Sequence, residues 1–152
     1  MANKRRKISD AVEIVESVEK ELYKKIRAYI AAARTKVYTV ANEAMVKAYW
    51  NVGREIEQGG GGRSVYGDGL IDRLAIKLTA EFGPGYTRVN LFHMRHFYLA
   101  FPKVHTLCKQ LSWSHYRTLI TVDNRDARDF YLSEAAKCKW SVRDLPRRKR
   151  RL

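Results

Sequence analysis

Proline is scarce in this sequence and absent from its first half. The three prolines are Pro84, Pro102 and Pro146, and the first of the nine glycines is Gly53. These two residue types interrupt helices most strongly. A long helical segment is therefore allowed in the first fifty residues, where apolar side chains recur at helical spacing.

Cysteine and long apolar runs are also lacking. Cys108 and Cys138 are too few for a disulfide framework, so we expect free thiols in a reducing cytoplasm. No apolar run approaches the roughly 20 residues of a membrane span. Asp10 and Glu13 place charge where a secretory signal needs an apolar core. These absences favour a cytoplasmic protein with no membrane partner.

Acidic residues are heavily outnumbered, with 16 Asp and Glu against 30 Lys and Arg and a net charge of +14. Lys4–Lys7 and Arg147–Arg151 hold nine of the positive charges. We expect a basic disordered tail over residues 1–9, a helical domain over 10–145 and a second basic tail over 146–152. Such an excess attracts phosphate, so nucleic acid is the leading candidate partner.

The pattern predicts an all-α fold, because no segment alternates as a strand does. A single helix from Asp10 to Gln58 would be about 70 Å long, so we expect two helices with a break near residues 34–39. The alternative is one long helix that serves as a dimerisation arm. Later helices are expected over Leu70–Phe82, Thr87–Phe101, Ser112–Ile120, from Asp123 or Asn124 to Cys138, and over Ser141–Leu145.

A tight turn separates two of these helices. Gly83 and Pro84 end the first helix, and Thr87 can cap the second. Helix, turn and helix in succession are typical of DNA readers. At 100° per residue, four basic residues share one side of the second helix and are candidate DNA contacts: Arg88, Arg95, His96 and Lys103.

A second helix–turn–helix pattern lies near the end of the chain. A helix stops around Cys138, Trp140 follows as a core anchor, and Ser141 can cap a short basic helix. The candidate DNA contacts there are Arg143, Arg147 and Arg148. In the preceding helix, Phe130 and Tyr131 are expected to face the core. Aromatic residues at helical spacing, such as Phe97 and Tyr116, favour a core role over base stacking.

Other chemistry is weakly supported. The glycine run at 59–62 lacks the strand and the Lys-Ser/Thr helix of a phosphate loop, so we interpret it as a flexible loop. His93 with His96, and His105 with Cys108, are isolated pairs that do not make a zinc site. Ser112 and His115 lie on one helix and cannot form a triad alone. We predict no metal and no other cofactor.

Several motifs, in this order and spacing, resemble the N-terminal, DUF1016-type domain of YhcG-like nucleases. The resemblance covers residues 26–145, and the run Leu-Ser-Trp-Ser-His-Tyr is its most specific part. The segments that carry it include Tyr49–Gly53, Glu81–Tyr86, Asn90–Leu91, Met94–Arg95, Leu111–Tyr116 and Trp140–Leu145.

The resemblance implies a helical domain that precedes a PD-(D/E)XK nuclease domain and is thought to bind DNA. Here Arg-Arg-Lys-Arg-Arg-Leu stands where relatives continue into the nuclease. We therefore expect a non-enzymatic module that binds double-stranded DNA. The alternative is a protein-interaction module, either a homo-oligomer through the N-terminal helices or a docking surface for a nuclease partner.

Overall fold

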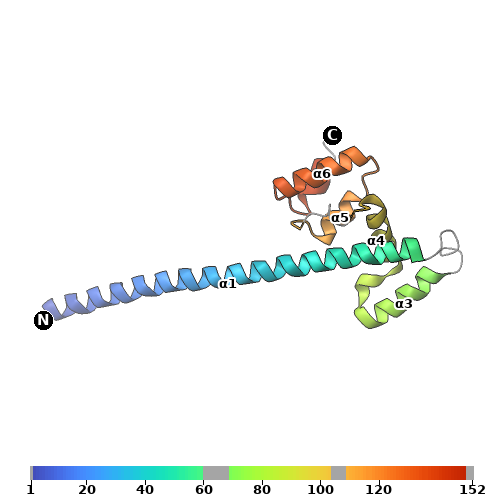
Figure 1. The fold of residues 1–152 in the computed structure, drawn as a ribbon. Helices are drawn as coiled ribbons and strands as arrows, with labels where there is room; N and C mark the ends of the chain where they lie inside the picture. The colour runs from blue at the N-terminus through green and yellow to red at the C-terminus, as the bar shows by residue number, and fades with distance from the viewer. Residues whose placement is uncertain (1, 60–68, 104–108, 150–152) are drawn as a thin grey trace. The chain divides into compact units, whose positions relative to one another are not determined.

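The computed structural model describes residues 2–59, 69–103 and 109–149. Within these ranges the structure contains helices and no strand, which confirms the all-α class (Figure 1). None of the described helices has an apolar stretch long enough to cross a membrane. The elements are α1 (Ala2–Gly59), α3 (Leu70–Phe82), the 3-10 helix η1 (Pro84–Tyr86), α4 (Arg88–Ala100), α5 (Trp113–Leu119), α6 (Arg125–Lys137) and α7 (Asp144–Lys149).

The first helix, α1, is continuous through residues 34–39, so the predicted break there is wrong. The hydroxyls of Thr35 and Thr39 donate to the carbonyls of Ala31 and Thr35, each at 2.9 Å. This bonding within the helix satisfies the threonines without interrupting the backbone ladder. The helix also includes Lys4–Lys7, where the sequence predicts a disordered tail.

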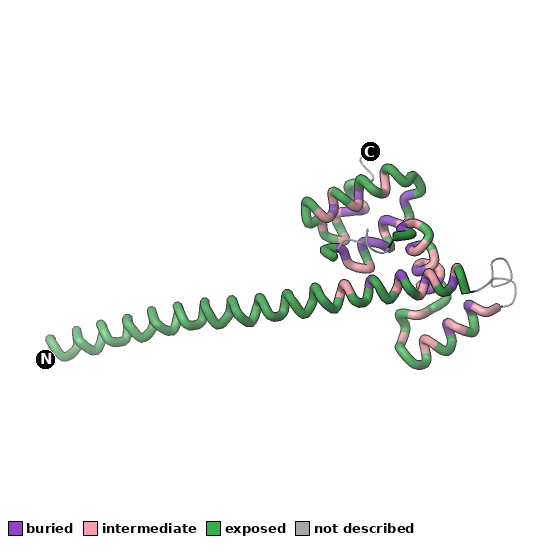
Figure 2. Tube along the Cα trace, viewed as in Figure 1, coloured by how far each residue is buried: buried purple, intermediate pink, exposed green. Residues whose placement is uncertain are grey.

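The chain divides into two units, residues 1–40 and 41–152. The first unit is the N-terminal part of α1, and its described side chains are all exposed (Figure 2). The second unit contains the end of α1 and the remaining helices. Every side chain that the structure describes as buried lies in the second unit.

Helix α4 forms the centre of the second unit. Its side chains Leu91, Met94 and Phe97 have no exposed surface. Leu91 and Met94 pack with residues of α3 and of the end of α1, whereas Phe97 joins a second cluster built from α1, α5, α6 and α7. The members of that second cluster are Val46, Trp50, Phe97, Phe101, Leu111, Tyr116, Leu119, Val122, Tyr131, Ala135 and Leu145.

The aromatic side chains fill this core. Phe97 and Tyr116 are fully buried with ring centroids 4.7 Å apart, which confirms the core interpretation. Trp140 is half-buried and packs against the same cluster. Tyr131 is buried as predicted, but Phe130 is 50% exposed, so its inward placement was wrong. Neighbouring helix residues point about 100° apart, and only one of the two can face the core.

Helices α1 and α4 cross at very short range. Gly53 is buried, and a Cβ built at this position would lie 2.0 Å from the carbonyl oxygen of Met94. On the same helix, Trp50 Nε1 donates to the Phe101 carbonyl at 2.6 Å. About two turns earlier on α1, the Asn42 side chain donates to the Leu111 carbonyl at 2.9 Å. Only glycine allows the two backbones to approach this closely.

We predict that Gly53→Ala destabilises the second unit, because the added methyl group must push α1 away from the α4 backbone. The free energy of unfolding should fall by about 1–3 kcal/mol or more, measured by urea denaturation. Gly85→Ala is the matched control, since nothing lies within 4 Å of a Cβ there. Equal stability of the two variants would contradict the close crossing.

Candidate nucleic-acid interface

The turn between α3 and α4 has the predicted punctuation. Gly83 has a φ of 96°, and its N–H donates to the Thr79 carbonyl at 2.9 Å. Thr87 is extended, and its hydroxyl oxygen accepts the N–H of Asn90 at 3.4 Å. The positive φ explains the glycine, and the threonine caps α4. The local structure is confirmed, and the use of this turn on DNA stays a prediction.

Two predicted contacts on α4 are already paired with carboxylates. The Arg95 Nε lies 2.5 Å from a Glu57 carboxylate oxygen, and both side chains are mostly buried. Arg88 Nε lies 3.2 Å from Asp72, but both of these side chains are more than half exposed. The buried pair ties α4 to α1, so Arg95 has a structural role. Exposed pairs are weak and readily exchanged, so Arg88 remains accessible to a phosphate.

A third predicted contact, His96, belongs to a basic cluster between α4 and α5. It interacts electrostatically with His93, and Arg117 of α5 acts on His93 in the same way. We call these three residues the α4–α5 cluster. His96 and Arg117 are exposed, and His93 is half-buried with an Nδ1 that has no hydrogen-bond partner among the described residues. No carboxylate in the described part of the chain forms an ion pair with any of the three.

Sequence analysis identified His96 but missed His93 and Arg117. His93 entered the sequence-based predictions only as the metal-site partner of His96. Arg117 follows the buried Tyr116 on a different helix. The one available signal was that Arg117 is a cation in the last turn of a short predicted helix. Its proximity to α4 depends on how α5 packs, because the two helices are separated by residues 101–112.

The last helix, α7, carries the second set of predicted contacts. Ser141 and Asp144 cap it reciprocally, with Ser141 donating to the Asp144 carboxylate at 2.7 Å from its hydroxyl and 3.0 Å from its N–H. These hydrogen bonds lower the pKa of Asp144. The basic residues Arg143, Arg147 and Arg148, the α7 set, are all exposed, as is Lys103 after α4.

One member of the α7 set also has a packing role. The Arg148 guanidinium lies 4.7 Å from the ring centroid of Trp140, at cation–π distance. The Trp140 ring thus contacts Arg148. The Trp140 carbonyl forms a hydrogen bond with His115. Arg143 and Arg147 present their charge without such stacking in the described structure.

The pair Ser112 and His115 forms a helix cap and not a catalytic dyad. Nδ1 of His115 accepts the Ser112 N–H at 3.1 Å and lies 2.8 Å from the Ser112 hydroxyl. Nε2 lies 2.8 Å from the Trp140 carbonyl, which can only accept, so Nε2 is the donor of this hydrogen bond. His115 is only 9% exposed. Nδ1 therefore caps the start of α5, and Nε2 connects that start to the segment before α7.

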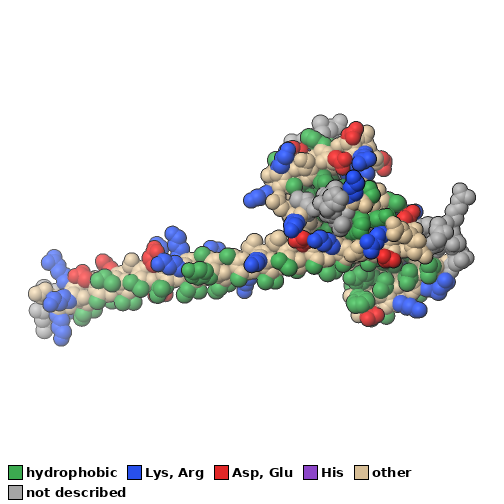
Figure 3. Space-filling view, in the orientation of Figure 1, with side chains coloured by type: hydrophobic (Ala, Val, Ile, Leu, Met, Phe, Trp, Pro, Cys, Tyr) green, Lys and Arg blue, Asp and Glu red, His purple; other side chains and the backbone are tan. Residues whose placement is uncertain are grey.

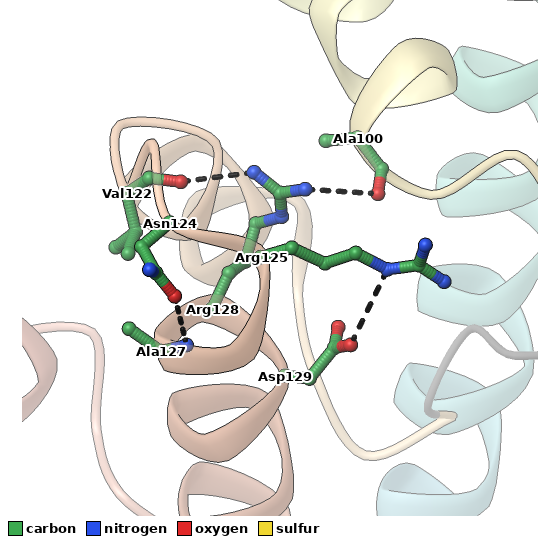
Figure 4. A network of polar contacts seen from close by, with 7 residues as sticks. All are labelled: Ala100, Val122, Asn124, Arg125, Ala127, Arg128 and Asp129. Carbon is green, nitrogen blue, oxygen red and sulfur yellow. Dashed lines mark hydrogen bonds and ion pairs between the residues drawn. The ribbon is translucent and has the colours of Figure 1, made fainter.

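Arg128 of α6 is a cation used inside the fold. Its Nη1 and Nη2 donate to the carbonyls of Val122 and Ala100 at 2.9 and 3.4 Å (Figure 4). The guanidinium also lies 5.7 Å from the ring centroid of Phe101. Arg128 thus joins the end of α4 to the start of α6 and does not belong to the candidate interface.

The part of the chain that the structure describes contains no group of three or more His, Cys, Asp or Glu residues able to hold a metal. The pair His105 and Cys108 lies outside the described residues. The candidate interface therefore consists of cations and offers an anionic ligand a surface of positive charge.

The fold and the candidate interface define an all-α basic module in which capped helices surround a central α4. The chain belongs to the DUF1016 N-terminal domain family, which matches residues 25–151 and confirms the resemblance. It is also 34% identical, over 153 aligned residues, to the Escherichia coli (strain K12) protein named "Putative nuclease YhcG". The match covers 78% of this chain and 41% of that relative. No solved structure matches significantly.

We predict that Arg128→Ala lowers the free energy of unfolding by about 1–3 kcal/mol, because two buried carbonyls lose their donor. Arg128→Lys should not restore stability, since one ammonium cannot reproduce the fork of the guanidinium. Arg125→Ala is the matched control, as Arg125 is exposed and 3.8 Å from Asp129. Urea denaturation of the three variants measures the difference, and a loss of similar size in the control would refute the role of Arg128.

We also predict a pH dependence of stability from His93. Burial, with the charges of Arg117 and His96, lowers its pKa below the usual value of about 6.5. The unfolded chain therefore takes up the proton first as pH falls, and the free energy of unfolding should decrease from pH 7.5 to 5.5. His93→Gln should reduce this slope in urea titrations. The lowered carboxylate pKa values of Glu43 and Asp144 act only below about pH 4.5.

Proposed function

We propose that this protein is a non-catalytic DNA-binding module related to the targeting part of a nuclease. The observation that carries the proposal is the α4–α5 cluster, where three groups able to bear positive charge gather without a carboxylate partner in the described structure. An anion bound beside Arg117 would gain the positive charge of the guanidinium and would favour the protonated form of His93.

The charge of the second unit supports a polyanionic ligand. Residues 41–152 contain twenty Lys and Arg against eleven Asp and Glu, hence nine net positive charges independent of the first unit. Arg95 and Arg128 are held inside the fold, so they contribute little to an exposed surface. The proposed phosphate contacts are Arg88, His96, Lys103 and Arg117, with Arg143, Arg147 and Arg148 of the α7 set.

The proposed mode is contact with the phosphate backbone. Arginine, lysine and protonated histidine bind phosphate oxygens without reading sequence, and they set the position of a protein on the duplex. The exposed start of α4, beside Arg88, is the element that could reach base edges. Catalysis is not proposed, because His115, which lies beside the Ser112 hydroxyl, is buried in a helix cap.

We predict that Arg117→Gln combined with Arg147→Gln weakens binding to a labelled random duplex in fluorescence anisotropy. If about six phosphates are neutralised, log affinity should fall with log salt at a slope near −5, and the double variant should reduce that slope by about 2. Lys20→Gln with Lys77→Gln removes the same charge elsewhere and is the control. An unchanged slope in the first variant would exclude the two residues from the interface.

A further variant separates the folded surface from the N-terminal basic run. Replacing Lys4, Arg5, Arg6 and Lys7 by Gln removes four charges from the first unit in the full chain. If the second unit binds DNA, the steep salt slope persists in this variant. Loss of all binding would show that the terminal charge was the whole signal and would refute the proposal.

The alternative function is docking of a nuclease partner. It is favoured by one observation, the 34% identity to a relative named as a nuclease. Under this alternative the purified chain binds no DNA, and the salt series described above would be flat at every protein concentration.

A further inference from the structure

An apolar stripe follows the first unit along its whole described length. Figure 3 shows hydrophobic side chains gathering along one side of α1. At 100° per residue the stripe occupies an arc of about 120° and is about 48 Å long. We call it the α1 stripe, and its members, all at least half exposed, are Ile8, Val12, Val15, Val18, Leu22, Ile26, Tyr29, Ile30, Val37 and Val40.

A helix of this length needs a cover for such a stripe. Most helical stability in water comes from burial of an apolar face and not from intrinsic propensity. The first unit is separate from the second, and its described side chains, the apolar ones included, are all exposed. The stripe therefore calls for an apolar partner of similar length.

The charged residues of the first unit are arranged along the helix in segments of opposite sign. Residues 10–21, the acidic segment, contain five acidic residues and one lysine. Residues 24–36, the basic segment, contain five basic residues and no acidic one. The centres of the two segments are about equally far from Tyr23. A second copy turned end for end about Tyr23 would place each acidic segment beside a basic segment.

We propose that the first unit pairs with that of a second copy of this chain as an antiparallel helical dimer whose symmetry axis passes near Tyr23. In this arrangement the two α1 stripes cover one another. A parallel arrangement in register would instead place acidic beside acidic and basic beside basic, which is destabilising.

Glu19 supports the antiparallel direction independently. By helical angle it lies within the α1 stripe, between Val15 and Leu22. A parallel dimer would bury the two Glu19 carboxylates against each other at high cost. Reversal about Tyr23 brings each Glu19 near Arg27 of the other copy, so the buried charge gains a counter-ion.

The change of charge sign along α1 also favours a second copy of the chain over other partners for the α1 stripe. A membrane surface or a nucleic acid would favour a polar face that is basic throughout, whereas five carboxylates occupy residues 10–21. A second copy is the partner that supplies both signs at the required places. The proposal does not depend on DNA binding by the second unit.

The first experiment measures mass in solution for the full chain. We expect light scattering to show a dimer whose population rises with concentration. Leu22→Glu should weaken association by about a hundredfold or more, since both copies lose a buried leucine. Ser17→Glu, on the opposite side of the helix, is the matched control and should stay dimeric. A wild-type chain that is monomeric at every concentration would overturn the proposal.

A charge exchange tests the direction of pairing without needing the atomic register. In the exchanged chain the five acidic residues of the acidic segment become Lys and the five basic residues of the basic segment become Glu. Antiparallel pairing predicts that this chain associates with itself but not with wild type in native mass spectrometry. A preference for mixed dimers would show parallel pairing and overturn the antiparallel proposal.

Distances between spin labels provide a second readout of direction. Ser9→Cys and Lys24→Cys are each labelled in a background with Cys108→Ser and Cys138→Ser. Antiparallel pairing predicts a separation of about 40 Å at residue 9, since it lies fourteen residues from the axis in each copy. At residue 24, which lies next to the axis, it predicts a clearly shorter separation set by the width of the helix pair. Equal separations at the two sites would contradict the proposed axis.

Discussion

The second unit depends on the close crossing of α1 and α4 at Gly53. This contact brings the α1 backbone against the Met94 carbonyl and so lets Trp50 reach the Phe101 carbonyl. With α1 in that position, Leu91 and Met94 join one core cluster and Phe97 joins the other. A wider crossing would open both clusters, because protein interiors tolerate few voids. The exposed remainder of α4 carries the candidate interface.

The cations of the second unit serve two separate purposes. Arg128 and Arg95 are enclosed by carbonyls or a carboxylate and connect helices to one another. Arg117 and His96 lie at the surface without a carboxylate partner among the described residues. Burial, together with the charges of Arg117 and His96, lowers the pKa of His93. Charge of one sign thus stabilises the fold where counter-groups surround it and remains available to a ligand where they do not.

Most helix boundaries could be predicted because helix caps and helix-ending residues act locally. Gly83, Thr87, Ser112 and Asn124 act through bonds to residues at most four positions away, so their effect is visible in the sequence. The errors came from weaker local signals. The β-branched residues near 35–40 lower helix propensity only slightly, and with no glycine or proline α1 continues through them.

The sequence by itself determined the all-α class, the helix caps and the family, because each depends on short-range periodicity or on matching motifs. Only the tertiary structure decided which cations are enclosed and which are exposed. Arg95 and His96 are adjacent in sequence, yet one faces Glu57 and the other lies near His93 and Arg117. That distinction arises from contacts between helices far apart in the chain, and spacing along a single helix does not contain it.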